Sequence, residues 1–280
     1  MFELRITTRR GSRREIVLRP ESFVFPGGEV QVRADLPAEE IEALTISADL
    51  RSSDDVMALL LLADALRRQI GDAPISLDLP YVPYARQDRV CNPGEALAAK
   101  VFCTLINGLG FASVTILDPH SDVVPALLDR VHVVDASIPL SRVVAREEFR
   151  RGVTLLAPDG GSRKRVAGLA RRLALPDVAY ADKVRCTKSG EITAVAVPDT
   201  LLPQPVLVVD DICDGGRTFL ELAQALRGVT DQPLYLYVTH GIFSKGVEVL
   251  LKDYQGIFTT RDWTASGNPA VTVISSGGQS

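Results

Sequence analysis

The chain has 280 residues, of which 46% are hydrophobic and 24% are charged, as in a globular protein large enough for two domains. Its formal net charge of −4 leaves no basic excess, which argues against nucleic-acid binding and favours small substrates. No apolar run reaches the roughly 18 residues that a transmembrane helix needs, so we expect a cytoplasmic protein that contacts no membrane.

Short apolar segments recur along the chain and alternate with stretches of helical periodicity. The predicted strands are residues 44–47, 75–79, 114–117, 153–157 and 206–209. Strands that alternate with helices in this way predict a parallel sheet, so the expected fold class is α/β.

Two helix starts can be placed from their capping residues. Ser52 and Asp55 form a capping pattern for a helix that runs to about residue 70. Asn92, Pro93 and Glu95 suit the N-cap, N1 and N3 positions of a second helix. This second helix is expected to bury an apolar stripe made of Ala98, Val101, Phe102, Leu105 and Leu109.

The order of strand and helix starts again after residues 135–139, and a new helix is expected from about Leu140. We therefore expect two domains, residues 1–138 and 139–280, and the last residues of the second could pack back on the first. The two halves share no residue-level repeat, so only the rhythm of elements predicts a duplicated fold.

The four cysteines are scattered and form neither a CxxC pair nor a zinc-binding spacing. Neither a disulfide framework nor a metal cluster is therefore expected. Buried free thiols are the simplest interpretation of Cys91, Cys103, Cys186 and Cys213.

The most informative segment follows the strand predicted at residues 206–209. Asp210 and Asp211 end this strand, and Asp214, Gly215 and Gly216 begin a glycine-rich turn before a helical run. Such a turn offers backbone N–H groups and the positive end of a helix dipole to an anion, while paired carboxylates can accept hydrogen bonds from vicinal sugar hydroxyls. A sugar phosphate fits the whole segment. The alternative, in which Asp214 only caps the helix and the glycines only make a tight turn, stays open.

Residues 206–218 resemble the phosphoribosyl diphosphate binding loop of type I phosphoribosyltransferases and of phosphoribosyl diphosphate synthetases. Two segments resemble the synthetases alone: residues 80–89 look like their ATP-binding segment, and residues 25–30 look like the hairpin that grips adenine from a neighbouring subunit. The similarity continues, in the expected order, through residues 63–68, 118–120, 158–161 and 239–244. It therefore covers nearly the entire chain.

This resemblance implies two α/β domains, each built on a parallel sheet of type I phosphoribosyltransferase kind, with the active site between them. It implies that the enzyme transfers the β,γ-diphosphoryl group of MgATP to the 1-hydroxyl of ribose 5-phosphate, giving phosphoribosyl diphosphate and AMP. Because the adenine hairpin serves a neighbour's site in the family, a homo-oligomer, either a dimer or a hexamer, is also implied.

The resemblance assigns a role to each candidate residue. ATP would be held by Phe25, Glu29, Arg86, Gln87 and Asp88. Ribose 5-phosphate would be held by Asp210, Asp211, Asp214, Gly215, Gly216, Arg217 and Thr218. His120 and Asp159 would ligate Mg²⁺, and Lys183 and Arg185 would stabilise the transferring phosphoryl group. Asp159 is the safer of the two metal ligands, because Mg²⁺ prefers oxygen to imidazole nitrogen.

Each of these segments also has a plainer interpretation. Arg86 and Asp88 could belong to a solvated loop, and His120 to an ordinary surface loop. Lys183 and Arg185 could belong to a charged strand edge. The resemblance favours the functional interpretation in all three cases.

The chain departs from the family pattern at three places. The usual loop reads Asp-Thr-Gly-Gly-Thr, whereas Gly215 and Arg217 alter it here, and Gly27 stands where Asp is usual. Residues 90–95 replace a typically basic segment, which argues against the phosphate and ADP control found in many relatives.

These departures leave alternatives open. The altered loop would suit an acceptor whose 5-phosphate is esterified, such as ADP-ribose, because Arg217 can contact a diphosphate bridge. A regulatory subunit without activity is a second alternative, although Lys183, Arg185, His120 and Asp159 would then have no chemical purpose. A phosphoribosyltransferase is a third, and the two ATP segments argue against it.

Overall fold

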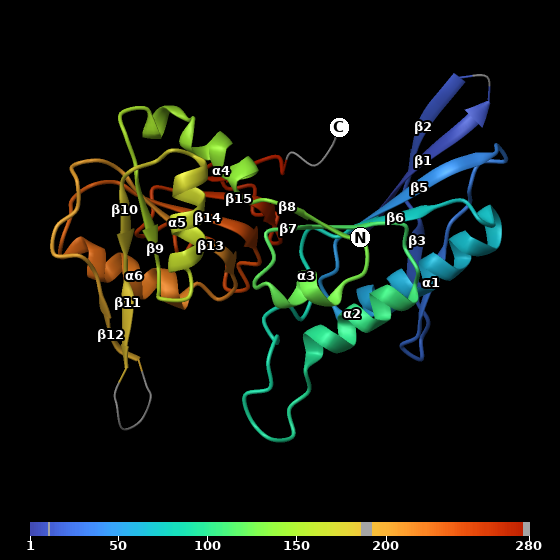
Figure 1. The fold of residues 1–280 in the computed structure, drawn as a ribbon, viewed down its shortest axis with the longest axis horizontal. Helices are drawn as coiled ribbons and strands as arrows, with labels where there is room; N and C mark the ends of the chain where they lie inside the picture. The colour runs from blue at the N-terminus through green and yellow to red at the C-terminus, as the bar shows by residue number, and fades with distance from the viewer. Residues whose placement is uncertain (11, 186–191, 277–280) are drawn as a thin grey trace. The chain divides into compact units, whose positions relative to one another are not determined.

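A computed structural model describes residues 1–10, 12–185 and 192–276. The chain divides into two compact units, Met1–Val134 and Asp135–Ser280, a few residues before the boundary expected at 138/139 (Figure 1).

The first unit contains a six-stranded sheet in the order β2-β1-β5-β6-β7-β8. Its strands are β1 (Phe2–Arg10), β2 (Ser12–Leu18), β5 (Ile41–Ala48), β6 (Ile75–Asp78), β7 (Val114–Leu117) and β8 (Val131–Val134). Strands β5 to β8 are parallel, and β1 pairs antiparallel with both β2 and β5. Strands β3 (Glu21–Val24) and β4 (Val30–Arg33) form a separate antiparallel hairpin, and the helices are α1 (Ser53–Ile70), α2 (Ala98–Gly108) and α3 (Val123–Leu127).

The structure confirms the predicted N-terminal cap of helix α1. The Ser52 hydroxyl accepts a hydrogen bond from the backbone N–H of Asp55 at 3.2 Å, and the Asp55 carboxylate accepts one from the backbone N–H of Ser52 at 2.9 Å. This reciprocal pair satisfies two donors that the first turn would otherwise leave open. In the described part of the chain, no helix is both long and apolar enough to cross a membrane.

The predicted start of the second helix is wrong. The Glu95 carboxylate accepts hydrogen bonds from the backbone N–H groups of Cys91 and Asn92, at 2.9 and 3.0 Å, and from the Asn92 side chain at 2.6 Å. These bonds close a turn instead of opening a helix, so α2 begins only at Ala98.

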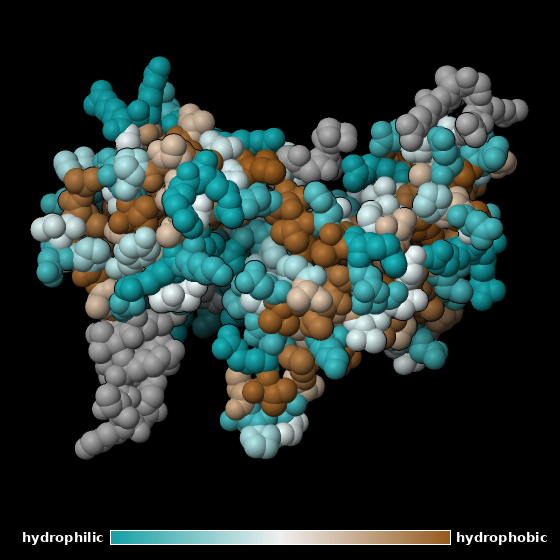
Figure 2. Space-filling model, viewed as in Figure 1, coloured by the Kyte–Doolittle hydropathy of each residue, from teal (hydrophilic) through white to brown (hydrophobic). Residues whose placement is uncertain are grey.

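The predicted core stripe of this helix is only partly confirmed: Phe102 is buried, and Leu109 packs partly buried against the same core. The buried residues of α2 are Ala99, Phe102, Cys103 and Ile106, whereas Val101 and Leu105 are 57% and 42% exposed. Both stripes are apolar, so hydrophobicity alone could not decide between them. Hydrophobic side chains are also visible on the projecting loop that precedes α2 (Figure 2).

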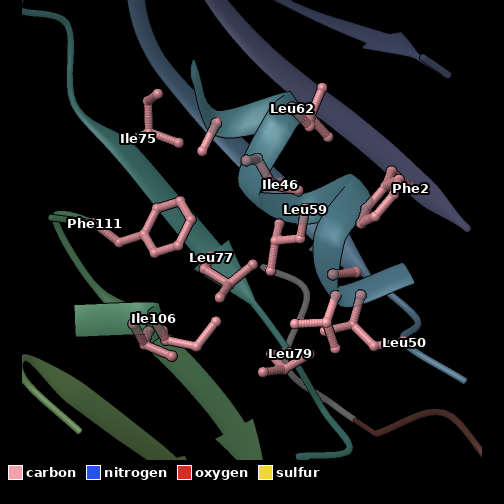
Figure 3. Close-up of a cluster of buried hydrophobic side chains, with 14 of the residues drawn as sticks. Phe2, Ile46, Leu50, Leu59, Leu62, Ile75, Leu77, Leu79, Ile106 and Phe111 are labelled. Atoms are coloured by element: carbon pink, nitrogen blue, oxygen red, sulfur yellow. The ribbon is translucent and has the colours of Figure 1, made fainter. Parts of the chain in front are cut away.

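The core of the first unit lies between the sheet and its helices. Ile46 of β5 and Leu77 of β6 pack with Leu59 and Leu62 of α1, and all four are at most 1% exposed (Figure 3). Burying such side chains supplies the main driving force for folding this unit.

The second unit contains a fully parallel sheet in the order β10-β9-β13-β14-β15-β16. Its strands are β9 (Thr154–Ala157), β10 (Val178–Tyr180), β13 (Val206–Cys213), β14 (Leu234–Gly241), β15 (Gly256–Asp262) and β16 (Val271–Val273). Its helices are α4 (Ser137–Val144), the short 3₁₀ helix η1 (Glu147–Phe149), α5 (Arg163–Arg172) and α6 (Arg217–Arg227), and β11 (Asp182–Arg185) pairs antiparallel with β12 (Ile192–Ala196). Parallel strands make up β5 to β8 of the first sheet and the whole of the second, which confirms the α/β class.

Helices cover both faces of this second sheet (Figure 1). Leu207 and Val209 of β13 pack in a cluster with α4 and α5, and the alternating residues Val206 and Val208 pack in a cluster with α6. The strand order reverses at β9, because β10 lies on one side of it and β13 on the other. In open α/β sheets, ligands bind at the carboxyl ends of the strands at such a reversal.

The end of the described chain is bound within the second unit. Ile274 is 9% exposed in the same cluster as α4, and Arg142 donates a hydrogen bond to the Ser275 carbonyl at 2.6 Å. Residues 277–280, which belong to the tail expected to return to the first domain, lie outside the described residues.

The prediction that the cysteines are buried free thiols is only partly confirmed. Cys103 and Cys213 are buried and free, as expected, but Cys91 is exposed, and Cys186 lies outside the described residues. Burial raises the pKa of the Cys103 thiol to about 11, and burial with the nearby Asp214 and Asp210 charges raises the pKa of Cys213 to about 12.

These pKa values predict selective alkylation. Thiolate is the reactive form, and a raised pKa keeps Cys103 and Cys213 protonated at pH 8. Iodoacetamide should therefore modify Cys91 in the folded protein and leave Cys103 and Cys213 unmodified, as peptide mass spectrometry can measure. Equal labelling of Cys213 and Cys91 would contradict this burial, and the denatured protein, in which all these thiols should react, is the control.

Candidate active site

A pair of acidic residues lies near the carboxyl end of β13. The strand continues past its predicted end at residue 209 to Cys213, so Asp210 and Asp211 lie within it. The extension arises because β14 pairs with residues beyond the apolar run, for example His240 with Ile212. Asp211 is 5% exposed, and its Oδ2 lies 3.7 Å from the Nη2 of Arg165 on α5.

The negative charges of Asp210 and Asp211 are only partly offset by neighbouring positive charge. Burial, the neighbouring Asp211 and the charge of Asp159 raise the pKa of Asp210 well above its ordinary value. Three carboxylates thus influence one another here, while Arg165 is ion-paired with Asp211. Such a cluster favours ligands that bring hydroxyl donors or a cation.

Asp159 is anchored by its own loop. Its Oδ1 accepts hydrogen bonds from the backbone N–H groups of Gly161 and Ser162 at 3.1 and 3.2 Å, and the Ser162 hydroxyl donates to the Asp159 carbonyl at 2.8 Å. A carboxylate held in this way, next to Asp210, has the oxygen donors that Mg²⁺ prefers. Within the described residues no group of three His, Cys, Asp or Glu side chains is placed to hold a metal ion.

The glycine-rich turn leads into α6. Gly216 occupies the N-cap position, with φ +77°, so Asp214 is not the N-cap residue of this helix. A Cβ built on Gly216 would lie 3.1 Å from Cδ2 of Leu250, so the position is both conformationally and sterically restricted to glycine. The first N–H groups of a helix have no acceptor within it, so the start of α6 can bind an anion.

A second loop, residues 242–245, is bonded to this turn. The backbone N–H groups of Ile242 and Phe243 donate to the Cys213 carbonyl at 2.9 and 3.0 Å, and that of Ser244 donates to the Asp214 carbonyl at 3.2 Å. The resemblance found in the sequence extends to Ser244. The structure places the next residue, Lys245, close to the turn as well. Cε of Lys245 lies 3.7 Å from the position that a Cβ on Gly215 would take.

Arg217 is engaged on the surface of α6. Its Nε donates to Oε1 of Glu221 at 2.6 Å, and its side chain is 82% exposed. The pair follows the ordinary i, i+4 spacing of a helix.

In the first unit, the segment with Arg86, Gln87 and Asp88 forms a tight turn. The backbone N–H of Gln87 donates to the Tyr84 carbonyl at 2.9 Å, and the Gln87 carbonyl accepts from the N–H of Ala99 at the start of α2 at 3.2 Å. Tyr84 adopts a left-handed conformation, with φ +62°. These bonds fix the backbone of the segment against α2, while the side chains of Arg86 and Gln87 are exposed.

Asp88 connects this turn to the loop that contains His120. Burial alone would raise the pKa of Asp88, but hydrogen bonds from Ser121 and Arg89, together with the charges of Arg89 and His120, hold it below its ordinary value. The Asp88 side chain is 7% exposed. Two segments predicted to bind ATP and metal are therefore brought together within one unit.

The β3–β4 hairpin presents an exposed aromatic tip. The backbone N–H of Phe25 donates to the Glu29 carbonyl at 2.8 Å, and Gly28 donates to the Phe25 carbonyl at 2.8 Å. Phe25 is 47% exposed and contacts Phe23 edge to face, with ring centroids 5.2 Å apart.

Lys183 and Arg185 belong to β11, whose backbone pairs Lys183 with Val195 of β12. The register shifts between Val184 and Arg185, and β11 is a strand separate from β10. The side chains of Lys183 and Arg185 lie outside the described residues, so their expected role at the transferring phosphoryl group stays a prediction.

Comparisons with known proteins identify a family for both units. Residues 17–110 match the model of the N-terminal domain of ribose phosphate pyrophosphokinase, and residues 134–263 match the phosphoribosyl transferase domain. The chain is 31% identical over 234 residues to a ribose-phosphate pyrophosphokinase of Thermococcus kodakarensis, covering 82% of this chain and 80% of that one. It is 33% identical over 201 residues to that of Bradyrhizobium diazoefficiens, covering 71% of this chain and 62% of the relative.

The fold is similar to that of a solved structure. The phosphoribosylpyrophosphate synthetase of Mycobacterium smegmatis superimposes with a TM-score of 0.76 and 21% identity, over 91% of this chain and 85% of that chain. At this identity the likeness concerns the fold alone.

Proposed function

Because the chain belongs to the ribose-phosphate pyrophosphokinase family of ATP-dependent diphosphotransferases, we propose that it transfers the β,γ-diphosphoryl group of MgATP to the 1-hydroxyl of ribose 5-phosphate. The observation that carries this proposal is the acidic pair followed by a glycine turn and a helix N-terminus, at the strand-order reversal of the second sheet. The products are phosphoribosyl diphosphate and AMP, and the phosphorylated substrates suit the cytoplasmic location predicted from the sequence.

The sugar phosphate binds along β13 and the turn that follows. Asp210 and Asp211 accept hydrogen bonds from the 2- and 3-hydroxyls, which supply the donors that this acidic cluster favours. The backbone N–H groups of residues 214–218, with the Thr218 hydroxyl, cradle the 5-phosphate at the positive end of α6.

ATP binds to the turn of the first unit. Arg86 contacts its phosphates through a planar set of donors, and Gln87 reads a polar edge of the base. Asp88 is bonded to the His120 loop and so positions both segments. Phe25 and Glu29, exposed at the tip of the hairpin, would grip the adenine of a second copy of the chain, which makes the active form a homodimer or hexamer.

Asp159 and His120 would hold the Mg²⁺ ion that accompanies ATP. When bound, the ion neutralises charge on the phosphate oxygens. Asp159 contributes a carboxylate oxygen fixed by two backbone N–H groups, and the His120 loop is fixed through Asp88.

The reaction needs no covalent enzyme intermediate. The ribose O1 attacks the β-phosphorus in line with the bond to the α,β-bridging oxygen; the new O1–P bond forms as that bond breaks, AMP leaves with the bridging oxygen, and the hydroxyl proton passes to solvent. Lys183 and Arg185 neutralise the charge that develops on the transferring group, since phosphoryl transfer depends mainly on positioning and charge.

The test is AMP release from MgATP by the purified protein, with ribose 5-phosphate and, in parallel, ADP-ribose as acceptor. We expect turnover with ribose 5-phosphate and a loss of more than about tenfold in the Lys183→Ala variant, equivalent to about 1.4 kcal/mol of barrier. Lys252→Ala, which removes an exposed lysine elsewhere in the second unit, is the control. Turnover with ADP-ribose alone would assign a different acceptor, silence with both would support a regulatory subunit, and full activity of Lys183→Ala would contradict the mechanism.

A further inference from the structure

We infer that the ammonium group of Lys245 neutralises the phosphate of the sugar substrate. The sequence suggested Arg217 for this role. The inference rests on the proposed function, because it names a further binding residue of the same site.

Lys245 is carried to the turn by the backbone of its own loop. Three hydrogen bonds, from the N–H groups of residues 242–244 to the carbonyls of Cys213 and Asp214, fix this loop at 2.9 to 3.2 Å. The Lys245 stem then runs past Gly215, with Cε and Cδ 3.7 and 3.9 Å from the position of a Cβ on that glycine. The ammonium group, bonded to Cε, is therefore held beside the turn that opens α6.

The charge balance of the site favours such a cation. A phosphate bound at the start of α6 would lie near Asp214 and at the end of the strand that carries Asp210 and Asp211. The helix dipole offsets only roughly half an elementary charge. An additional positive side chain strengthens the binding of a dianion at such a turn.

The other nearby cations are already engaged. Arg165 is ion-paired with Asp211, and Arg217 is ion-paired with Glu221. Lys245 is exposed, and among the described residues it has no ion pair within 4.0 Å. Its ammonium can therefore pair with the ligand without first losing a protein partner, whereas Arg217 would have to leave Glu221.

The kinetic test compares four variants. Lys245→Met should raise the KM for ribose 5-phosphate at least about tenfold, with the KM for ATP within about twofold of wild type. Lys245→Arg should recover most of the affinity, because it restores the charge. Arg217→Met should raise the KM for ribose 5-phosphate less than Lys245→Met does, and Lys252→Met controls for loss of an exposed lysine. An unchanged KM in Lys245→Met, or a larger rise in Arg217→Met, would overturn the inference.

Calorimetric binding separates this inference from the proposed reaction. Ribose 5-phosphate and inorganic phosphate are titrated into the wild-type protein and into Lys245→Met, without ATP. If wild type binds both but does not turn over, and Lys245→Met binds neither, the proposed reaction fails and the role of Lys245 stands. If wild type turns over and Lys245→Met binds as tightly as wild type, the reaction stands and Lys245 has no role. If wild type binds neither ligand, both proposals fail.

Discussion

Replacing Gly241 by alanine is expected to destabilise the second unit by about 3 kcal/mol or more. A Cβ on Gly241 would lie 2.1 Å from Cε2 and 2.6 Å from Cζ of Phe243, and 2.8 Å from the backbone oxygen of Arg261. Phe243 is 1% exposed, so its ring cannot swing into solvent without emptying part of the core. The Arg261 oxygen belongs to β15, so moving it disturbs the pairing of β14 with β15.

The free energy of unfolding, measured by urea titration with circular dichroism, tests this expectation. Gly168→Ala is the matched control, because Gly168 lies inside α5 and the nearest atom to its Cβ would be Nη1 of Arg172 at 3.7 Å. Alanine is the better helix former, so this variant should be as stable as wild type or more stable by up to about 1 kcal/mol. Equal stability of the Gly241 and Gly168 variants would show that Phe243 does not pack where the structure places it.

The same substitution should also abolish sugar-phosphate binding. Gly241 immediately precedes the loop whose N–H groups bond to the Cys213 and Asp214 carbonyls, so displacing Phe243 displaces that loop. Only glycine permits the close approach of residue 241 to Phe243. The packing of β14 and the shape of the turn proposed to bind the phosphate therefore depend on the same residue.

Features encoded by local spacing could be predicted from the sequence. The α1 cap depends on two residues three positions apart, and the structure confirms both of its hydrogen bonds. The acidic pair and the glycine turn were likewise visible as consecutive residues. The start of α2 was missed because Glu95 has the right spacing for a helix cap, yet its carboxylate instead closes a turn with Cys91 and Asn92.

Features that depend on contacts between distant segments could not be predicted. Arg165 lies on a helix remote in sequence from Asp211, and no local pattern indicates that they pair. Lys245 carries no pattern of its own, since an exposed lysine after a strand is common. Only the bonds between residues 242–244 and the turn after β13 place it beside Gly215. Arg217 is exposed and ion-paired with Glu221, so its expected contact with a phosphate stays a prediction.

Replacing Arg165 by methionine is expected to lower the free energy of unfolding by about 3 kcal/mol and to weaken sugar binding strongly. The side chains of Arg165 and Asp211 are 19% and 7% exposed, so removing the cation leaves a buried carboxylate beside Asp210, whose pKa Asp159 also raises. Breaking a buried pair costs more than the pair itself contributes, because the remaining charge stays buried without the cation that offset it. Urea titration and calorimetric binding of ribose 5-phosphate measure the two effects.

Arg172→Met is the matched control for this variant. Arg172 lies on the same helix and pairs with Asp135 at 3.3 Å, but these side chains are 56% and 41% exposed, so the loss should stay within about 1 kcal/mol.

The pH dependence of the free energy of unfolding supplies a second check. Burial and the charges of Asp211 and Asp159 raise the pKa of Asp210, so without Arg165 the ionised acidic cluster should destabilise the fold at neutral pH and cease to do so once it is protonated. The loss of unfolding free energy in Arg165→Met should therefore become smaller as the pH falls. A loss that is equal in Arg165→Met and Arg172→Met, or that does not change with pH, would show that Arg165 acts through packing and not through charge.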